Sequence, residues 1–112
     1  MEPKPHTLDA QITRQEEPYG PLPTFHYAQT QDFSYTLAVD AHVFRNFISV
    51  DLFKLLNLIV RRHPEPYVIE GGHHIISQCR LPFRVGSYED ELWCDVVGVK
   101  SISVILGREW IT

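Results

Sequence analysis

Two glycine turns divide the second half of the chain into long extended runs. Gly71-Gly72 precedes a run at residues 73–85, and Gly86-Ser87 separates that run from another at residues 88–97. Both runs are rich in β-branched and aromatic residues, and the glycine pairs favour tight turns. Residues 81–97 are therefore predicted to form a β-hairpin, with Pro82 interrupting its first strand.

The first half of the chain predicts another pair of strands. Residues 25–28 and 33–39 favour β-structure, and the polar residues 29–32 between them favour a turn. In the second strand, Phe33, Tyr35 and Leu37 alternate with smaller residues, which indicates one packed face.

One helix is predicted after these strands, and a last strand near the end of the chain. Ser49 suits a helix N-cap. Four apolar residues then share one helical face, over about three turns that end before Pro64: Leu52, Leu55, Leu56 and Ile59. Residues 67–70 are expected to be extended, and residues 101–106 to form the last strand. Strands without strand–helix alternation indicate a mainly β, mainly antiparallel domain with one or two short helices.

The composition changes near residue 23. Five of the eight prolines lie before Thr24, and such a segment buries little apolar surface on its own. Residues 1–23 are therefore predicted to be a flexible, proline-rich N-terminal arm, with residues 24–112 as the domain. An arm that docks onto the domain or a partner is the alternative.

Charge and hydropathy exclude several classes of protein. The formal net charge is -4, and no basic run is longer than Arg61-Arg62, so nucleic acid is not an expected partner. No apolar stretch is long enough for a bilayer, and no signal-peptide core is present, so a cytoplasmic or nuclear, non-secreted protein is expected. Cys79 and Cys94 are expected to be reduced core residues.

Three segments together resemble a known family. Residues 37–49, LAVDAHVFRNFIS, place Asp40 after an apolar strand and before Asn-Phe-Ile-Ser. They resemble the active-site segment of retropepsins from plant-type, gypsy-class LTR retrotransposons, in which an apolar strand leads into Asp-Ser/Thr-Gly. Residues 82–97 resemble the hairpin that follows the flap in that family. Residues 104–110, VILGREW, resemble its closing strand, glycine turn and C-terminal helix.

The resemblance implies a small closed antiparallel β-barrel of the acid-protease type. It also implies that two chains pair, each supplying one aspartate, and that the two carboxylates share a proton and activate water. Asp40 is then the candidate catalytic residue, and a flap with Gly71, Gly72 and His73 covers the bound peptide. The residues expected to support the site structurally are Ile105, Leu106, Gly107 and Arg108. No cofactor or metal is implied.

The sequence departs from the family pattern in four places. Ala41 replaces the hydroxyl residue that braces the dyad, and His42 replaces the glycine, with strain expected if that position needs a positive φ. The flap at residues 68–78 is short, and the chain ends at Thr112, soon after the closing turn. These departures together predict a degenerate module with lost or weak proteolysis, which acts as a scaffold for a peptide, a protein or a second copy.

Several alternatives stay open from the sequence. The chain could be an active dimeric aspartic endopeptidase, or an unrelated small β domain in which Asp40 is only a turn residue. His42 could be a base, although a hydrogen-bond partner for the aspartate is the expected role. His73 and His74 point to opposite faces of a strand, so they are not expected to bind a metal.

Overall fold

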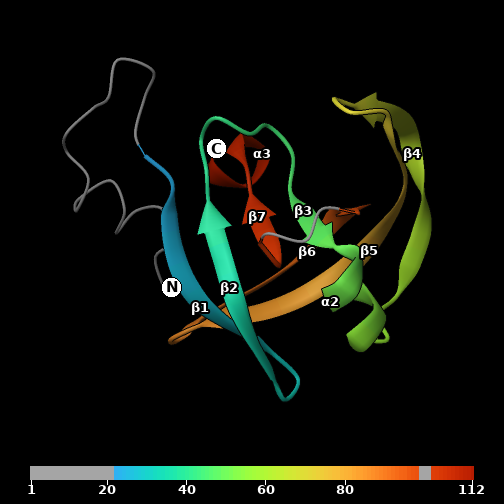
Figure 1. The fold of residues 1–112 in the computed structure, drawn as a ribbon. Coiled ribbons are helices and arrows are strands. Elements are labelled where there is room, and N and C mark those ends of the chain that lie inside the picture. Colours follow the sequence, from blue (N-terminus) through green and yellow to red (C-terminus); the bar gives the residue numbers. More distant parts are fainter. Residues whose placement is uncertain (1–21, 99–101) are drawn as a thin grey trace.

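The strands follow the predicted order along the chain, with one addition, a short strand at residues 47–49 before the predicted helix. The computed structural model describes residues 22–98 and 102–112 (Figure 1). Most of the predicted arm, residues 1–21, and the start of the predicted last strand lie outside these residues. The elements are β1 Thr24–Thr30, β2 Phe33–Val39, β3 Phe47–Ser49, α2 Val50–Leu55, β4 Val60–Ile69, β5 His73–Val85, β6 Tyr88–Val97, β7 Val104–Leu106 and α3 Arg108–Ile111.

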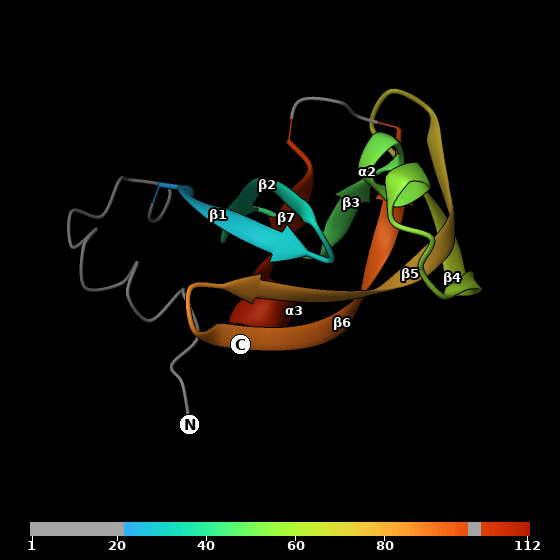
Figure 2. The ribbon, with the colours of Figure 1, turned by 90° about the horizontal axis from the view of Figure 1, so that it is seen from below.

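Six of the described strands close into a ring. Their order is β1-β2-β7-β3-β6-β5, and a pairing of Gln29 with Arg84 joins β5 back to β1. β4 lies outside the ring and pairs with β5 (Figures 1 and 2). Five of the seven pairings among the described residues are antiparallel, whereas β2–β7 and β3–β6 are parallel. The predicted fold, a small closed β-barrel with two short helices, is confirmed.

The two predicted hairpins of the ring form at the expected turns. β1 and β2 pair from Thr24–Val39 to Thr30–Phe33, with Gln31 in a left-handed conformation at φ 55°. β5 and β6 pair from Gln78–Asp95 to Val85–Tyr88, and Gly86 supplies the positive φ that their turn requires. Both pairings follow from local sequence signals.

The core lies inside the ring. Alternate positions of β5 and β6, including Cys79, Leu81, Phe83 and Cys94, contribute to it because successive strand residues point to opposite faces. The fully buried residues include Leu37, Ile48, Leu56, Leu81, Val104 and Leu106. Tyr35 and Leu37 are buried as predicted, but Phe33 is 37% exposed at the hairpin turn.

The predicted three-turn helix is wrong in length. α2 has six residues, and Ser49 caps it as predicted, with its Oγ accepting a hydrogen bond from Leu52 N at 3.2 Å. Leu52 and Leu56 are buried, but Leu55 is 59% exposed and Ile59 is 72% exposed. Only half of the predicted apolar stripe therefore faces the core.

The segment after α2 is an edge strand, a position that tolerates its two prolines. β4 extends from Val60 through Pro64 and Pro66 to Ile69, and its register with β5 shifts between Arg62 and Tyr67. Proline lacks the N–H that a central strand needs, and it is tolerated on an edge or at a bulge. The expectation of a short extended segment at residues 67–70 captured only the end of this strand.

Pro82 does not interrupt β5, contrary to the prediction. The strand continues through it from His73 to Val85. Pro82 lies between the part of β5 that pairs with β4 and Arg84, which pairs with β1. On that side β5 has no backbone pairing at Pro82, so a missing N–H is tolerated there.

No helix within the described residues is long and apolar enough to cross a membrane.

Candidate functional site

Asp40 begins the loop that follows β2, at one end of the barrel. Its backbone N–H donates to the Leu106 carbonyl at 3.0 Å, which extends the parallel β2–β7 pairing by one residue. The sequence predicted that Asp40 and the Ile105-Leu106-Gly107 turn would lie together, and the structure places them side by side. In Figure 1 the loop crosses the end of the barrel next to α3.

The Asp40 loop, residues 40–46, is held by hydrogen bonds to the glycine turn and α3. Arg108 N donates to the Val43 carbonyl at 2.8 Å, and Glu109 N donates to the Phe44 carbonyl at 2.8 Å. The side-chain oxygen of buried Asn46 accepts from Gly107 N at 2.9 Å. The first N–H groups of a helix lack partners within it, and the loop carbonyls satisfy them here.

Gly107 allows this close approach because it has no side chain. A Cβ at this position would lie 2.5 Å from the Arg45 carbonyl oxygen and 2.6 Å from that of Val43. Both distances are shorter than a carbon–oxygen contact permits, and backbone atoms cannot move aside. The glycine of the closing turn is therefore required by packing against the Asp40 loop.

The Asp40 carboxylate pairs with its near neighbour His42. Oδ1 accepts from His42 N at 2.9 Å, and His42 Nδ1 lies 3.1 Å from the same oxygen. The aspartate side chain is 21% exposed and the imidazole 42% exposed. Among the described non-glycine residues, only Gln31 has a positive φ, so His42 does not have the backbone strain that a positive φ would cause.

Arg108 contacts an aromatic ring. Its guanidinium lies 5.7 Å from the centre of the Phe44 ring, at a cation–π distance. The arginine links the start of α3 to the Asp40 loop, in keeping with a structural role.

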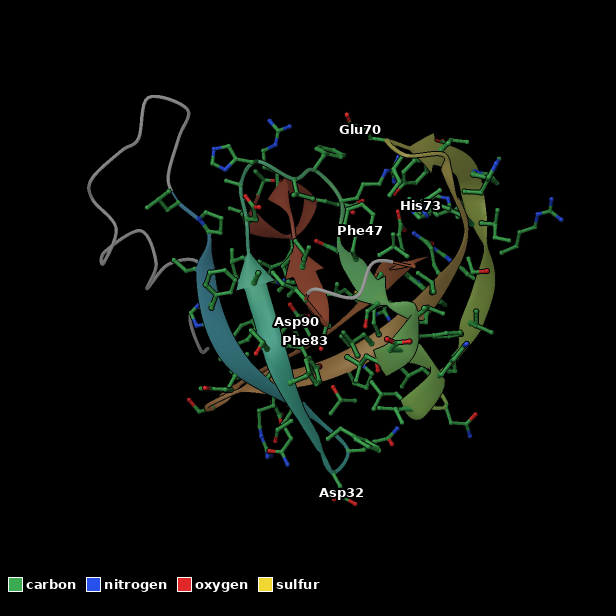
Figure 3. The ribbon with its side chains drawn as sticks, viewed as in Figure 1. Asp32, Phe47, Glu70, His73, Phe83 and Asp90 are labelled. Carbon is green, nitrogen blue, oxygen red and sulfur yellow. The ribbon has the colours of Figure 1, made fainter. Side chains whose placement is uncertain are left out.

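The β4–β5 hairpin is the candidate flap. Its tip is Gly71-Gly72, with φ of 90° and 80°, and Gly72 N donates to the Ile69 carbonyl at 3.1 Å. His73 pairs with Ile69 across the hairpin, and both His73 and His74 are exposed. In Figure 3, Glu70 at this tip lies at the same end of the molecule as the Asp40 loop.

An apolar pocket of about 170 Å³ lies between the hairpin and the Asp40 loop. Val43 comes from the loop, Ile69 from the end of β4, and the other lining residues come mainly from the barrel strands: Phe47, Ser49, Val97, Ile102 and Ile105. A pocket of this size and composition suits one aliphatic side chain of an extended peptide.

A buried polar cluster beneath the hairpin was missed by the sequence prediction. Asp95 of β6 receives hydrogen bonds from Gln78 of β5 and Tyr67 of β4, and His63 lies beside it. We call these four residues the Asp95 cluster. A carboxylate between the apolar residues of a strand was the available signal, but its partners are distant in sequence.

The cysteines lie opposite each other across β5 and β6. Cys79 pairs with Cys94, and both are free, fully buried thiols, as expected from the sequence. Burial raises the pKa of Cys79 to about 11 and raises the pKa of Cys94 well above its ordinary value. Both are therefore poor nucleophiles near neutral pH.

Among the described residues, no three His, Cys, Asp or Glu side chains gather as metal ligands do.

The architecture is similar to that of two solved structures. One is the retroviral protease-like domain of Ddi1 from Leishmania major, with a TM-score of 0.64 and 13% sequence identity; the match covers 78% of this chain and 73% of that chain. The other is EIAV protease complexed with the inhibitor HBY-793, with a TM-score of 0.63 and 11% identity, over 80% and 86% of the chains. The chain has a retropepsin-like fold. Its sequence matches no family model and no curated protein.

Within this retropepsin-like fold, one end of the barrel brings together most of the predicted site residues. Asp40, His42 and Gly107 are linked there by the Asp40 loop. The tip of the β4–β5 hairpin is connected to that end through the apolar pocket, because Ile69 and Val43 both line it.

Proposed function

We propose that this chain is a degenerate retropepsin-like module, derived from a retrotransposon polyprotein, that binds a peptide or protein segment with lost or weak proteolysis. The retrotransposon origin rests on the sequence resemblance of residues 37–49, 82–97 and 104–110. The proposal includes a second copy of the chain as a partner, because a retropepsin dyad needs one aspartate from each of two chains.

The pairing of Asp40 with His42 is the observation that supports lost or weak proteolysis. A dyad works when two carboxylates lie close enough to share a proton and hold a water molecule. Here Oδ1 of Asp40 is within hydrogen-bond distance of both the backbone N–H and the imidazole of His42. A ring at that oxygen competes with the second carboxylate and with the water.

Ala41 supports the same conclusion. A methyl group cannot donate or accept a hydrogen bond, so this chain cannot supply the hydroxyl that braces the dyad across two subunits in the family pattern. The dyad geometry would depend on the backbone of the Asp40 loop alone.

The apolar pocket supports the retention of binding. It is formed by the Asp40 loop, the barrel strands and the β4–β5 hairpin, and none of these is disrupted by Ala41 or His42. A pre-formed apolar pocket beside a β-hairpin suits an extended peptide, whose backbone pairs with strands while one side chain enters the pocket. Binding without cleavage is the function that this arrangement favours.

The alternative function is that of an active dimeric aspartic endopeptidase. The place of Asp40 beside Leu106, with its backbone hydrogen bond of 3.0 Å, favours this alternative. The carboxylate is also partly exposed, so a second chain and a water molecule could reach it.

A cleavage and binding assay separates the two functions. The full chain is incubated with a peptide library from mildly acidic to neutral pH, with and without a pepstatin-type inhibitor, and binding of apolar peptides is measured by calorimetry. We expect binding with little or no cleavage. The matched variants are Asp40→Asn and Asp32→Asn, because Asp32 lies at the opposite end of the molecule (Figure 3). Cleavage that Asp40→Asn abolishes and Asp32→Asn preserves would refute the proposal in favour of the endopeptidase.

The double variant Ala41→Ser/His42→Gly tests whether the two substitutions are responsible for the weak activity. It restores the hydroxyl and removes the ring from Asp40. We expect cleavage to rise above that of the wild-type chain, and a variant without any gain would locate the defect in the hairpin or in subunit pairing. Molar mass from light scattering, measured on the same samples, reports whether two copies associate.

A further inference from the structure

Asp95 is a carboxylate that the fold buries almost completely. Its side chain is 2% exposed, near the end of β6. Gln78 Nε2 of β5 donates to Oδ1 at 2.7 Å, and the Tyr67 hydroxyl of β4 donates to Oδ2. Removing an ionised carboxylate from water costs several kcal/mol unless it is well hydrogen-bonded. The two donors, one on β5 and one on β4, provide these hydrogen bonds.

His63 of β4 completes the Asp95 cluster. Its Nδ1 accepts from Glu65 N at 2.9 Å, so the ring proton of the neutral imidazole is assigned to Nε2. Nε2 lies 3.1 Å from Asp95 Oδ1, within reach of electrostatic attraction, although its N–H does not point at the oxygen. The ring also packs edge-on against Tyr67, with centres 5.4 Å apart. β4 therefore contacts the carboxylate from two positions, His63 within its register shift and Tyr67 where the pairing with β5 resumes.

The same residues contact the Asp40 loop. Asp95 N donates to the Asn46 carbonyl at 2.8 Å, at the end of that loop. The guanidinium of Arg45 lies 5.0 Å from the centre of the Tyr67 ring. Asp95 and Tyr67 thus connect the candidate flap to the loop that contains Asp40, and Ile69 of the apolar pocket is two residues beyond Tyr67.

We propose that the Asp95 cluster is a latch that fixes the β4–β5 hairpin over the Asp40 loop and so determines whether the apolar pocket is closed. This inference rests on the proposed function only in naming the groove as the place where a peptide binds. Tyr67 is then a positioning residue, because it acts on the pocket through the hairpin and through Arg45.

The physical argument for a latch is that the hydrogen bonds of the cluster are directional. β4 is joined to the barrel on one side only, through β5, and its ladder is broken between Arg62 and Tyr67. Apolar packing alone would allow the hairpin to slide, whereas hydrogen bonds to a fixed carboxylate hold it in one position. Burial, and then the hydrogen bond to Asp95, raise the pKa of Tyr67, so its hydroxyl stays a donor well above neutral pH.

The substitution Tyr67→Phe tests the latch with the loss of a single oxygen atom. Tyr27→Phe is the matched control, because Tyr27 is 85% exposed on β1. Methyl NMR of the full chain without peptide measures the nuclear Overhauser effect between Ile69 and Ile105, which line the same pocket. We expect Tyr67→Phe to weaken this effect and to lower amide-exchange protection at residues 67–75 roughly tenfold, as the loss of one hydrogen bond does. Protection in β2 and β6 should not change.

A Tyr67→Phe protein that matches Tyr27→Phe in both measurements would overturn the proposal. So would a uniform loss of protection in all strands, because it would mark the cluster as general stabilisation of the barrel. Asp95→Asn, which turns one acceptor oxygen into a donor, should loosen the hairpin further, but Tyr67→Phe decides the question even where that variant does not fold. Peptide calorimetry on the same variants tests the proposed function separately. If Tyr67→Phe loosens the hairpin but the wild-type chain binds no peptide, the latch proposal is supported and the proposed function is refuted.

Discussion

At the scale of single residues, Gly107 determines how closely the Asp40 loop can approach α3. Its backbone N–H binds Asn46, and the space of a side chain is occupied by the carbonyl groups of residues 43–45. The sequence indicated this glycine through the family resemblance. The structure adds the physical reason, which is a contact between two backbone segments that are distant in sequence.

The substitution Gly107→Ala should therefore destabilise the protein. The new Cβ would lie within 2.7 Å of three backbone atoms, and overpacking against rigid groups costs about 1–3 kcal/mol. Urea unfolding measures the change. Gly98→Ala is the control, because a Cβ at Gly98 meets nothing within 4 Å. Equal stability of the two variants would show that the Asp40 loop moves away from α3 without difficulty.

The thiols of Cys79 and Cys94 give a prediction on pH. Their pKa values are raised in the folded state, to about 11 for Cys79, because burial favours the neutral thiol. The stabilisation is complete below the ordinary thiol pKa and is lost as the pH rises towards 11. The free energy of unfolding should fall between about pH 9 and pH 11, and less so in Cys79→Ala.

A thiol reagent checks the same point directly. At pH 8 a disulfide reagent should leave both native cysteines unmodified, and should label both in urea. Rapid labelling of the folded chain would contradict the burial of the two side chains.

Sequence patterns located residues with a local partner and missed those whose partners are distant. Ser49 caps the helix three residues away, and His42 meets Asp40 two residues away. Asp95 was missed because its partners Tyr67 and Gln78 come from two other strands. A buried carboxylate can be suspected from apolar neighbours, but the donors that satisfy it depend on how the strands are arranged.

At the scale of elements, α2 shows the limit of periodicity as a guide. Leucine and isoleucine at helical spacing predicted a longer helix, yet the chain leaves the helix after Leu55 and enters β4 at Val60. Five residues after a helix, an edge strand with two prolines gains pairing with β5 and contacts with Asp95. Tertiary pairing therefore overrides the local helical pattern.

Two neighbouring leucines test this correction. Leu56 is fully buried, whereas Leu55 is 59% exposed. Leu56→Ala should lower the free energy of unfolding by about 2–5 kcal/mol, and Leu55→Ala by less than roughly 0.5 kcal/mol. Thermal or urea unfolding of the pair gives both values. Similar large losses of unfolding free energy in both variants would instead support the longer helix that the sequence predicted.

At the scale of the whole molecule, the ring combines local and distant pairings. The β1–β2, β4–β5 and β5–β6 hairpins join neighbours in the sequence. The ring closes only when β7 inserts between β2 and β3 and when β1 meets β5. Local turn signals were enough to predict the β1–β2 and β5–β6 hairpins. The parallel pairs could not be predicted in this way, because nothing in either strand specifies its distant partner.

The order in which these pairings form can be tested with two matched leucines. Leu81 lies in the β5–β6 hairpin and Leu106 in β7, and both are fully buried. Each change to alanine should destabilise the protein by about 2–5 kcal/mol.

Local contacts form before distant ones, because closing a long loop loses more chain entropy. Leu81→Ala should therefore mainly slow folding, and Leu106→Ala should mainly accelerate unfolding, in stopped-flow measurements across urea concentrations. If Leu106→Ala instead mainly slowed folding and Leu81→Ala mainly accelerated unfolding, β7 would reach its place before the long hairpin forms. The Asp40 loop, which depends on β7 and α3, would then be among the first parts of the molecule to become ordered.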